Sequence, residues 1–251
     1  QQRANKILNL ATKNGINFLD TAHDYGKAEK FIGNFCSRKK KTFYISTKLK
    51  NFLLKKNQPK NLIVNNVNES IFNSLKNLNT NVLDTYLVHD PKLLFRSKIV
   101  YNQLIKFLNC GIIKNIGASI YTPQEYYKLK KFKKINCVQI PFNLLDYRWV
   151  NILSRKQNKI KIFVRSIFLR GNIKKNRIKF PVFRKKYDYL ISNLNKFNKE
   201  FGKRDLLELS ISYVKAFKGI NYFIFGVQQK SDFVGILKYL KTDSLKKMET
   251  K

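Results

Sequence analysis

The 251-residue sequence is short of acidic residues, cysteine and long apolar runs. Its three cysteines are widely spaced, which favours a reducing compartment and neither a disulfide framework nor a zinc site. No apolar run approaches the roughly 18 residues of a membrane span. No signal-peptide pattern follows the opening residues Gln1–Lys6. We therefore expect a cytoplasmic protein that does not attach to a membrane.

The shortage of acidic residues leaves a very basic chain, with 15 aspartate and glutamate residues against 51 lysine and arginine residues and a net charge of +36. A charge of this size is typical of proteins that bind polyanions. The cations are mostly lysines scattered over the chain, however, whereas specific nucleic-acid contacts rely on arginine forks. We expect solvated lysine-rich faces and no specific nucleic-acid partner. An anionic partner, or attraction of an anionic substrate or cofactor, is the alternative.

The sequence does contain a regular alternation of apolar strands and amphipathic helices. Strands are predicted at residues 15–22, 41–48, 82–90, 112–119, 137–143, 160–166 and 222–226. Helices are predicted at residues 5–14, 27–35, 62–78, 97–109, 147–156, 187–201, 204–218 and 231–239, with a further helix that Thr122, Pro123 and Glu125 open as a capping box. A basic surface loop is predicted at residues 172–185.

This alternation predicts a parallel sheet covered by helices. Its natural closed form is an α/β fold, the (β/α)8 TIM barrel, in a single domain over residues 1–251. Only four residues precede the first predicted helix, so the strand that should come before it has no room. We therefore expect a barrel without its first strand, in a chain that is truncated or has lost that strand.

Ionisable residues end the first three predicted strands: Asp20, Lys48 and His89. Tyr25 lies in the loop after the first of them. Because the C-terminal ends of parallel strands meet at one rim of a barrel, we expect these four side chains to converge. Such a set can reduce a carbonyl. The tyrosine donates a proton, the lysine lowers the pKa of the phenol, the aspartate holds the lysine, and the histidine orients the substrate.

Each of these residues also has a plainer interpretation. An aspartate at a strand end often only caps a turn, a lysine there is usually solvated, and one tyrosine among 13 is most often a packing residue. His23 is interpreted as a loop residue near the pocket, and Cys137 as a small core residue. The order of the four candidates at successive strand ends favours the functional interpretation.

Five motifs resemble those of one known family, the aldo-keto reductases. The most specific is the run Gly15–Gly26, which reads Gly-Ile-Asn-Phe-x-Asp-Thr-Ala-x-x-Tyr-Gly. The others are Ser46-Thr47-Lys48, Asp84-Thr85-Tyr86-Leu87-Val88-His89, Ile116-Gly117-Ala118-Ser119 and Val138-Gln139-Ile140-Pro141-Phe142-Asn143. The resemblance covers nearly the whole chain. It implies a (β/α)8 barrel that binds a nicotinamide dinucleotide without a Rossmann motif, and the sequence indeed contains no Gly-x-Gly-x-x-Gly.

Carried over position by position, the resemblance implies that Tyr25 is the proton donor, Lys48 and Asp20 its tuning pair, and His89 the substrate-orienting residue. It implies no metal. The implied cofactor-binding positions are Ser119, Gln139, Arg165, Ser166, Gly226, Val227, Gln228 and Lys230.

Among these positions, Ser119 and Gln139 match the residues that hold the nicotinamide carboxamide. Arg165 stands where the family has an aromatic residue that stacks on the nicotinamide. Lys230 lies by the loop facing the adenosine phosphate and slightly favours NADP(H) over NAD(H).

The sequence therefore predicts an oxidoreductase that reduces an aldehyde or ketone to an alcohol with NADP(H) or NAD(H). Its expected partner is a small carbonyl compound, and its oligomeric state is left open. The alternative is a regulatory or sensor barrel that binds cofactor with little catalysis. Altered positions favour that alternative, namely Ile120 in place of the family's asparagine, Arg165 in place of an aromatic residue, and Gln228 in place of a basic residue.

Overall fold

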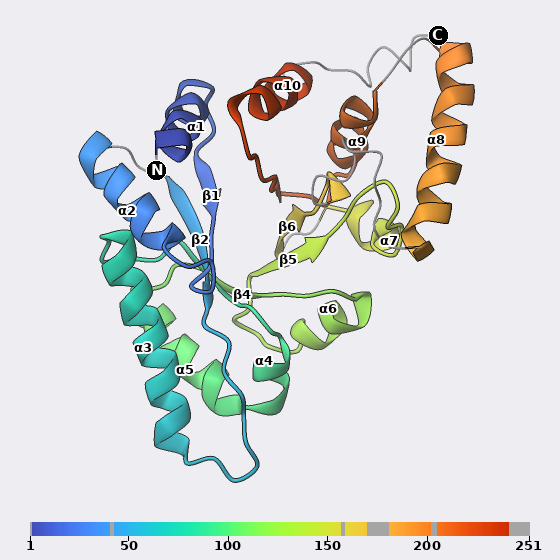
Figure 1. Cartoon of the computed structure of the whole chain (residues 1–251). Coiled ribbons are helices and arrows are strands. Elements are labelled where there is room, and N and C mark those ends of the chain that lie inside the picture. Colours follow the sequence, from blue (N-terminus) through green and yellow to red (C-terminus); the bar gives the residue numbers. More distant parts are fainter. Residues whose placement is uncertain (1, 41–42, 157–158, 170–180, 202–204, 241–251) are drawn as a thin grey trace. The chain divides into compact units, whose positions relative to one another are not determined.

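The structure is a computed structural model that describes residues 2–40, 43–156, 159–169, 181–201 and 205–240. The chain divides into two compact units (Figure 1). The first comprises Gln1–Ile140 and Lys159–Lys161, and the second comprises Pro141–Asn158 and Ile162–Lys251. The expectation of a single domain stays a prediction. Within the described ranges, no helix combines the length and the apolarity needed to cross a lipid bilayer.

Parallel strands form the centre of the first unit, and each lies beside the next one along the chain. The strands are β1 (Phe18–Asp20), β2 (Tyr44–Leu49), β3 (Thr85–Val88), β4 (Ile116–Ser119) and β5 (Cys137–Pro141), of which β5 belongs to this unit up to Ile140. Helices separate them: α1 (Gln2–Lys13), α2 (Ala28–Lys39), α3 (Lys60–Leu78), α4 (Lys92–Arg96), α5 (Lys98–Asn109) and α6 (Pro123–Leu129).

The order of strands follows from short β–α connections. When a helix connects each strand to the next parallel strand beside it, the strands lie in the sheet in the same order as in the sequence. The register aligns Asp20 with Ser46 and Ser119 with Gln139. Side chains of residues aligned in a ladder share one face of the sheet, so the register already places Ser119 beside Gln139.

The helices of the first unit cover the sheet with the apolar faces that the sequence predicts. In α3, Ile63, Val67, Ile71 and Leu78 are buried, at the spacing of three and four residues expected for one helix face. α2 packs against α3, and α3 against α5, along one side of this unit in Figure 1. Thr122 opens α6 with the predicted capping box.

The second unit contains two strands that pair in parallel. Along the chain, helices come before, between and after these strands. The strands are β6 (Lys161–Arg165, Lys161 itself belonging to the first unit) and β7 (Tyr222–Phe223), and the helices are α7 (Val150–Leu153), α8 (Pro181–Phe201), α9 (Leu206–Lys215) and α10 (Lys230–Leu240). An aromatic cluster forms its core: Phe142 stacks on Tyr213, with ring centroids 5.1 Å apart, and meets Phe217 edge-on at 4.9 Å.

Several predicted boundaries need correction. The predicted loop at 172–185 is wrong from Pro181 onward, because α8 begins there, and residues 172–180 lie outside the described residues. The short helix α4 was not predicted, since its five residues are too few to show a period. β1 and β7 are shorter than expected. The described residues contain seven strands, the number expected.

Candidate active site

The four candidates for catalysis all belong to the first unit, at the C-terminal ends of its first three strands. Asp20 is the last residue of β1, Lys48 the next-to-last residue of β2, and His89 the residue after β3. Tyr25 lies in the turn after β1, where its backbone nitrogen donates to the carbonyl of Ala22 at 3.0 Å. The parallel strand order therefore brings residues from three successive β–α connections to one edge of the sheet.

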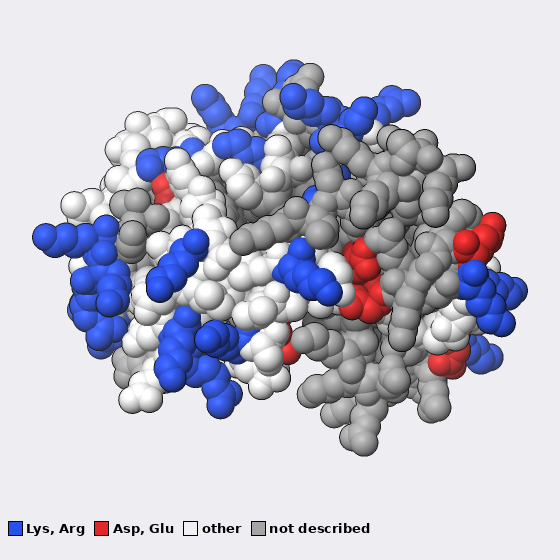
Figure 2. Space-filling view, turned by 90° about the horizontal axis from the view of Figure 1, so that it is seen from above, with Lys and Arg blue, Asp and Glu red and all other residues white. Residues whose placement is uncertain are grey.

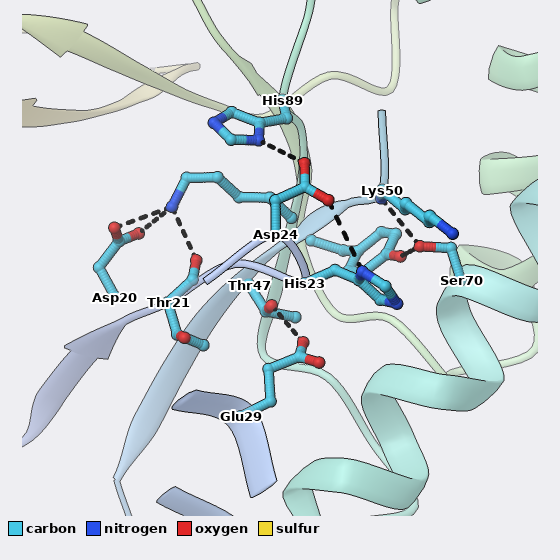
Figure 3. A network of polar contacts seen from close by, with 11 residues as sticks. Asp20, Thr21, His23, Asp24, Glu29, Thr47, Lys50, Ser70 and His89 are labelled. Atoms are coloured by element: carbon cyan, nitrogen blue, oxygen red, sulfur yellow. Dashed lines mark hydrogen bonds and ion pairs between the residues drawn. The ribbon is translucent and has the colours of Figure 1, made fainter. Parts of the chain in front are cut away.

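Asp20 and Lys48 form a buried ion pair. The Nζ atom of Lys48 donates to both carboxylate oxygens of Asp20, at 2.9 and 2.8 Å, and to the backbone oxygen of Thr21 at 2.7 Å (Figure 3). The Lys48 side chain is only 1% exposed and that of Asp20 only 10%. The plainer interpretation of Lys48, a solvated lysine at a strand end, is therefore wrong.

Tyr25 lies close to Lys48 and to His89. The Nζ atom of Lys48 is 5.4 Å from the centroid of the Tyr25 ring, and the ring of His89 meets it edge-on with centroids 6.3 Å apart. Tyr25 is 52% exposed, so its phenol ring is open to solvent. The plainer interpretation of Tyr25, a packing residue, fits this exposure poorly. The structure thus brings the four candidates together, and their roles stay predictions.

Asp24 joins this group, and the sequence reasoning missed it. Its carboxylate lies 3.3 Å from Nδ1 of His89 and 3.7 Å from Nδ1 of His23 (Figure 3). His23 does lie near the candidate site, as predicted. One signal in the sequence was available, because Asp24 is one of only 15 acidic residues and directly precedes Tyr25.

A buried polar layer that the sequence reasoning also missed supports these strands. Glu29 of α2 is 1% exposed and accepts a hydrogen bond from the hydroxyl of Thr47 at 2.6 Å and one from the amide of Asn77. Ser70 of α3 shares a 2.8 Å hydrogen bond with the hydroxyl of Tyr86. Figure 3 shows Glu29 beside Thr47, and Ser70 on its helix. Burial raises the pKa of Tyr86 and so keeps its phenol neutral. These bonds tie α2 to β2 at Thr47, the residue before Lys48, and α3 to the neighbouring strand β3 at Tyr86.

Two predicted cofactor residues, Ser119 and Gln139, are neighbours in the sheet, and Gln139 contacts the ion pair. Ser119 ends β4 and Gln139 lies in β5, and they are 2% and 1% exposed. The Nε2 atom of Gln139 donates to Oδ1 of Asp20 at 2.8 Å. A serine hydroxyl and a glutamine amide oxygen next to each other suit a carboxamide, which needs both a donor and an acceptor. Ile120, the next residue, is buried and offers no polar side-chain group.

The remaining predicted cofactor residues belong to the second unit. Arg165 is the last residue of β6, and Ser166 follows it with a φ of +62°, in the left-handed region that non-glycine residues rarely adopt. Gly226, Val227 and Gln228 lie between β7 and α10, and Lys230 is the first residue of α10. These residues occupy the strand ends and helix starts where barrels carry their binding groups.

Two further observations concern metals and surface charge. Among the residues that the structure describes, no group of three or more histidine, cysteine, aspartate or glutamate side chains is arranged to hold a metal ion. Lysine and arginine side chains are spread over several parts of the face shown in Figure 2, with few acidic side chains among them.

Comparison with solved structures identifies the fold. An aldo-keto reductase from Bacillus halodurans, in its holo form, matches with a TM-score of 0.76 at 21% identity, covering 95% of this chain and 82% of that one. A glycerol dehydrogenase from Gluconobacter oxydans also gives 0.76, at 18% identity, with 98% and 84% covered. These likenesses confirm the predicted (β/α)8 fold class, with seven strands in the described residues.

Sequence comparison identifies the family. The aldo-keto reductase YhdN of Bacillus subtilis is 26% identical over 176 residues, which cover 66% of this chain and 52% of that protein. The uncharacterized oxidoreductase YqkF of the same organism is 24% identical over 181 residues, with 68% and 58% covered. The chain thus spans little more than half the length of the curated relatives it matches. The model of the aldo/keto reductase family matches residues 1–251, and the chain therefore belongs to that family.

Proposed function

We propose that the protein reduces an aldehyde or ketone to an alcohol with a nicotinamide cofactor. The observation that carries this proposal is the buried pair of Lys48 and Asp20 next to an exposed tyrosine, Tyr25. A solvent-open phenol beside a fixed ammonium group can donate a proton to a substrate and tolerate the negative charge left behind. Membership of the family and the oxidoreductases among the relatives support the same chemistry.

In this proposal each residue has one task at the substrate oxygen. Tyr25 donates a proton from its hydroxyl as the carbonyl becomes an alcohol. Lys48 stabilises the resulting phenolate, and Asp20 holds Lys48 in place and balances its charge within a poorly hydrated site. His89 hydrogen-bonds the substrate oxygen and orients it.

The predicted cofactor positions of the first unit fit the same chemistry. A nicotinamide cofactor, when bound, supplies the hydride. Ser119 and Gln139 would hydrogen-bond its carboxamide. The hydrogen bond from Gln139 to Asp20 would connect these cofactor contacts to the ion pair. In the second unit, the family resemblance assigns Arg165 and Ser166 to cofactor binding, with Arg165 at the position that stacks on the nicotinamide. It assigns Gly226, Val227 and Gln228 to the loop that faces the adenosine phosphate. Lys230 favours NADP(H) slightly over NAD(H), since its ammonium suits a 2′-phosphate.

The test is the variant Tyr25→Phe. It should lose almost all turnover, because the phenol oxygen is the only proton donor in the proposal, while it binds NADH or NADPH about as well as the unmodified protein. Tyr127→Phe is the matched control, because Tyr127 is similarly exposed, on α6, and lies outside the candidate site. Turnover should be measured as nicotinamide absorbance over a panel of aldehydes and ketones, with glycerol as a substrate for the reverse direction. Unchanged turnover in Tyr25→Phe would contradict the mechanism.

A cofactor-binding sensor with little catalysis is the second candidate. The buried, apolar Ile120 and the guanidinium of Arg165 favour it, because both alter groups around the expected nicotinamide site. Quenching of the intrinsic fluorescence by NADPH or NADH, without turnover of any carbonyl in the panel, would support this candidate over the enzyme.

A further inference from the structure

Asp24 lies between the only two histidines of the chain, His23 and His89. Its Oδ2 atom is 3.3 Å from Nδ1 of His89, and its Oδ1 atom is 3.7 Å from Nδ1 of His23 (Figure 3). The distance to His89 is close to that of a hydrogen bond, whereas the distance to His23 is that of a looser ion pair. Asp24 is 33% exposed and each histidine 23%. The stronger partner of the carboxylate is therefore His89.

The chemistry of a carboxylate determines where the imidazole keeps its proton. An ionised aspartate only accepts hydrogen bonds, so its contact with Nδ1 of His89 requires a proton on that nitrogen. The Nε2 atom lies on the far side of the ring from Asp24 (Figure 3). The ring itself meets Tyr25 edge-on, at an interplanar angle of 85°.

We infer that Asp24 is a positioning residue, which keeps a proton on Nδ1 of His89 and leaves Nε2 to face the substrate. This inference rests on the proposed function, in which His89 contacts the substrate oxygen. A carboxylate that holds an imidazole fixes both its tautomer and its orientation.

The inference specifies how His89 contacts substrate and product. With Nδ1 protonated, a hydrogen bond to a carbonyl oxygen must come from Nε2 of a doubly protonated ring. In the neutral ring Nε2 carries no proton, so it accepts a hydrogen bond from the hydroxyl of an alcohol. In both forms of the ring, the contact between Asp24 and Nδ1 leaves Nε2 available to the substrate.

Local structure holds both residues of the contact in place. Asp24 lies inside the turn that the bond from the nitrogen of Tyr25 to the oxygen of Ala22 closes after β1. His89 directly follows Val88, a fully buried residue of β3. Neither side chain therefore depends on a long, unsupported loop, and the contact joins positions that are 65 residues apart.

The decisive measurement is the 15N NMR spectrum of the whole chain with labelled histidine. Two histidines give two sets of imidazole signals, and the variant His23→Gln assigns them. We expect Nδ1 of His89 to carry a proton at neutral pH in the unmodified protein. In Asp24→Ala the neutral ring should change to the Nε2–H form, which an unconstrained imidazole prefers. An Nε2–H tautomer of His89 in the unmodified protein overturns the inference, whether or not the variant folds.

Turnover provides the second measurement. Asp24→Ala should lower kcat/KM for a carbonyl about 10- to 100-fold, as misplaced catalytic groups do, with little change in cofactor affinity. Asp90→Asn is the matched control: it removes the same charge beside His89, and its amide oxygen can still accept the bond that Asp90 receives from the nitrogen of Lys92. An equal loss in both variants would overturn the inference. Absence of turnover in the unmodified protein would contradict the proposed function alone, because the spectrum still decides the role of Asp24.

Discussion

The ammonium group of Lys48 contacts both carboxylate oxygens of Asp20 where almost no solvent reaches it, at 2.9 and 2.8 Å and with 1% of the lysine side chain exposed. Gln139 donates a third hydrogen bond to Asp20, and the backbone oxygen of Thr21 is a further acceptor for Lys48. A buried ammonium group is stable only beside an opposite charge, because the transfer of each ion out of water costs several kcal/mol. The pair therefore links the stability of the first unit to its proposed chemistry.

Asp20→Asn should accordingly destabilise the protein. We expect its free energy of unfolding to fall by about 3–5 kcal/mol, because Lys48 would stay buried without its counterion. The double variant Asp20→Asn/Lys48→Met should recover part of this loss, since it leaves no unpaired charge. Urea unfolding followed by circular dichroism measures both.

The pair of Lys114 and Asp84 is the matched control. Its distance is the same, 2.9 Å, but Lys114 is 58% exposed. Lys114→Met should cost less than about 1 kcal/mol, because water screens an exposed pair. A loss for Asp20→Asn as small as that of the control would contradict the prediction.

Two glycines in helices should respond oppositely to alanine. A Cβ atom on Gly33 of α2 would overlap the backbone of Asn77 and Leu78, whereas one on Gly235 of α10 would meet only a side-chain carbon of Leu207 at 3.8 Å. Gly33→Ala should lower the free energy of unfolding by about 1–3 kcal/mol through overpacking. Gly235→Ala should raise it by about 0.5–1 kcal/mol, because alanine restricts the unfolded chain. Thermal or urea unfolding of both variants tests the pair, and a stabilising Gly33→Ala would refute the close packing of α2 on α3.

Tyr86 should make stability fall at alkaline pH. Burial raises its pKa above the ordinary value of 10.0, an effect that the hydrogen bond with Ser70 opposes. A group whose pKa is higher in the folded state contributes stability below its unfolded pKa and loses it as pH rises further. The stability advantage of the unmodified protein over Tyr86→Phe should therefore be constant near pH 8 and shrink above about pH 10. Unfolding titrations across this range measure it, and a constant difference would count against the buried phenol.

The three cysteines should react with a thiol reagent in a fixed order. Cys110 is exposed, Cys36 is partly buried, and Cys137 is fully buried. Burial raises the pKa of the Cys36 and Cys137 thiols and so depletes the reactive thiolate. In the native protein one thiol per chain should react rapidly, and Cys110→Ser should abolish that phase. Cys137 should react only after unfolding, and rapid labelling of Cys137 in the folded chain would contradict its burial in β5.

Local patterns were sufficient to predict most of the fold. The period of apolar residues located α3, the capping box at Thr122 located the start of α6, and the alternation of elements predicted parallel strands in chain order. These features depend on residues within a few positions of one another, which one sequence displays directly. The start of α8 at Pro181 was missed because the basic run Arg184-Lys185-Lys186 in its first turns was interpreted as part of a surface loop.

The candidate site required more than local patterns. The sequence by itself determined which residues end the strands, Asp20, Lys48 and His89, and that a tyrosine follows the first of them. Only the tertiary structure decided that Lys48 is buried on Asp20, that Gln139 reaches Asp20 across 119 positions, and that Asp24 contacts His89. The physical reason is that burial and pairing of charges depend on strand register and helix packing, which join residues far apart in the chain. A lysine at a strand end looks solvated until the carboxylate that neutralises it is placed beside it.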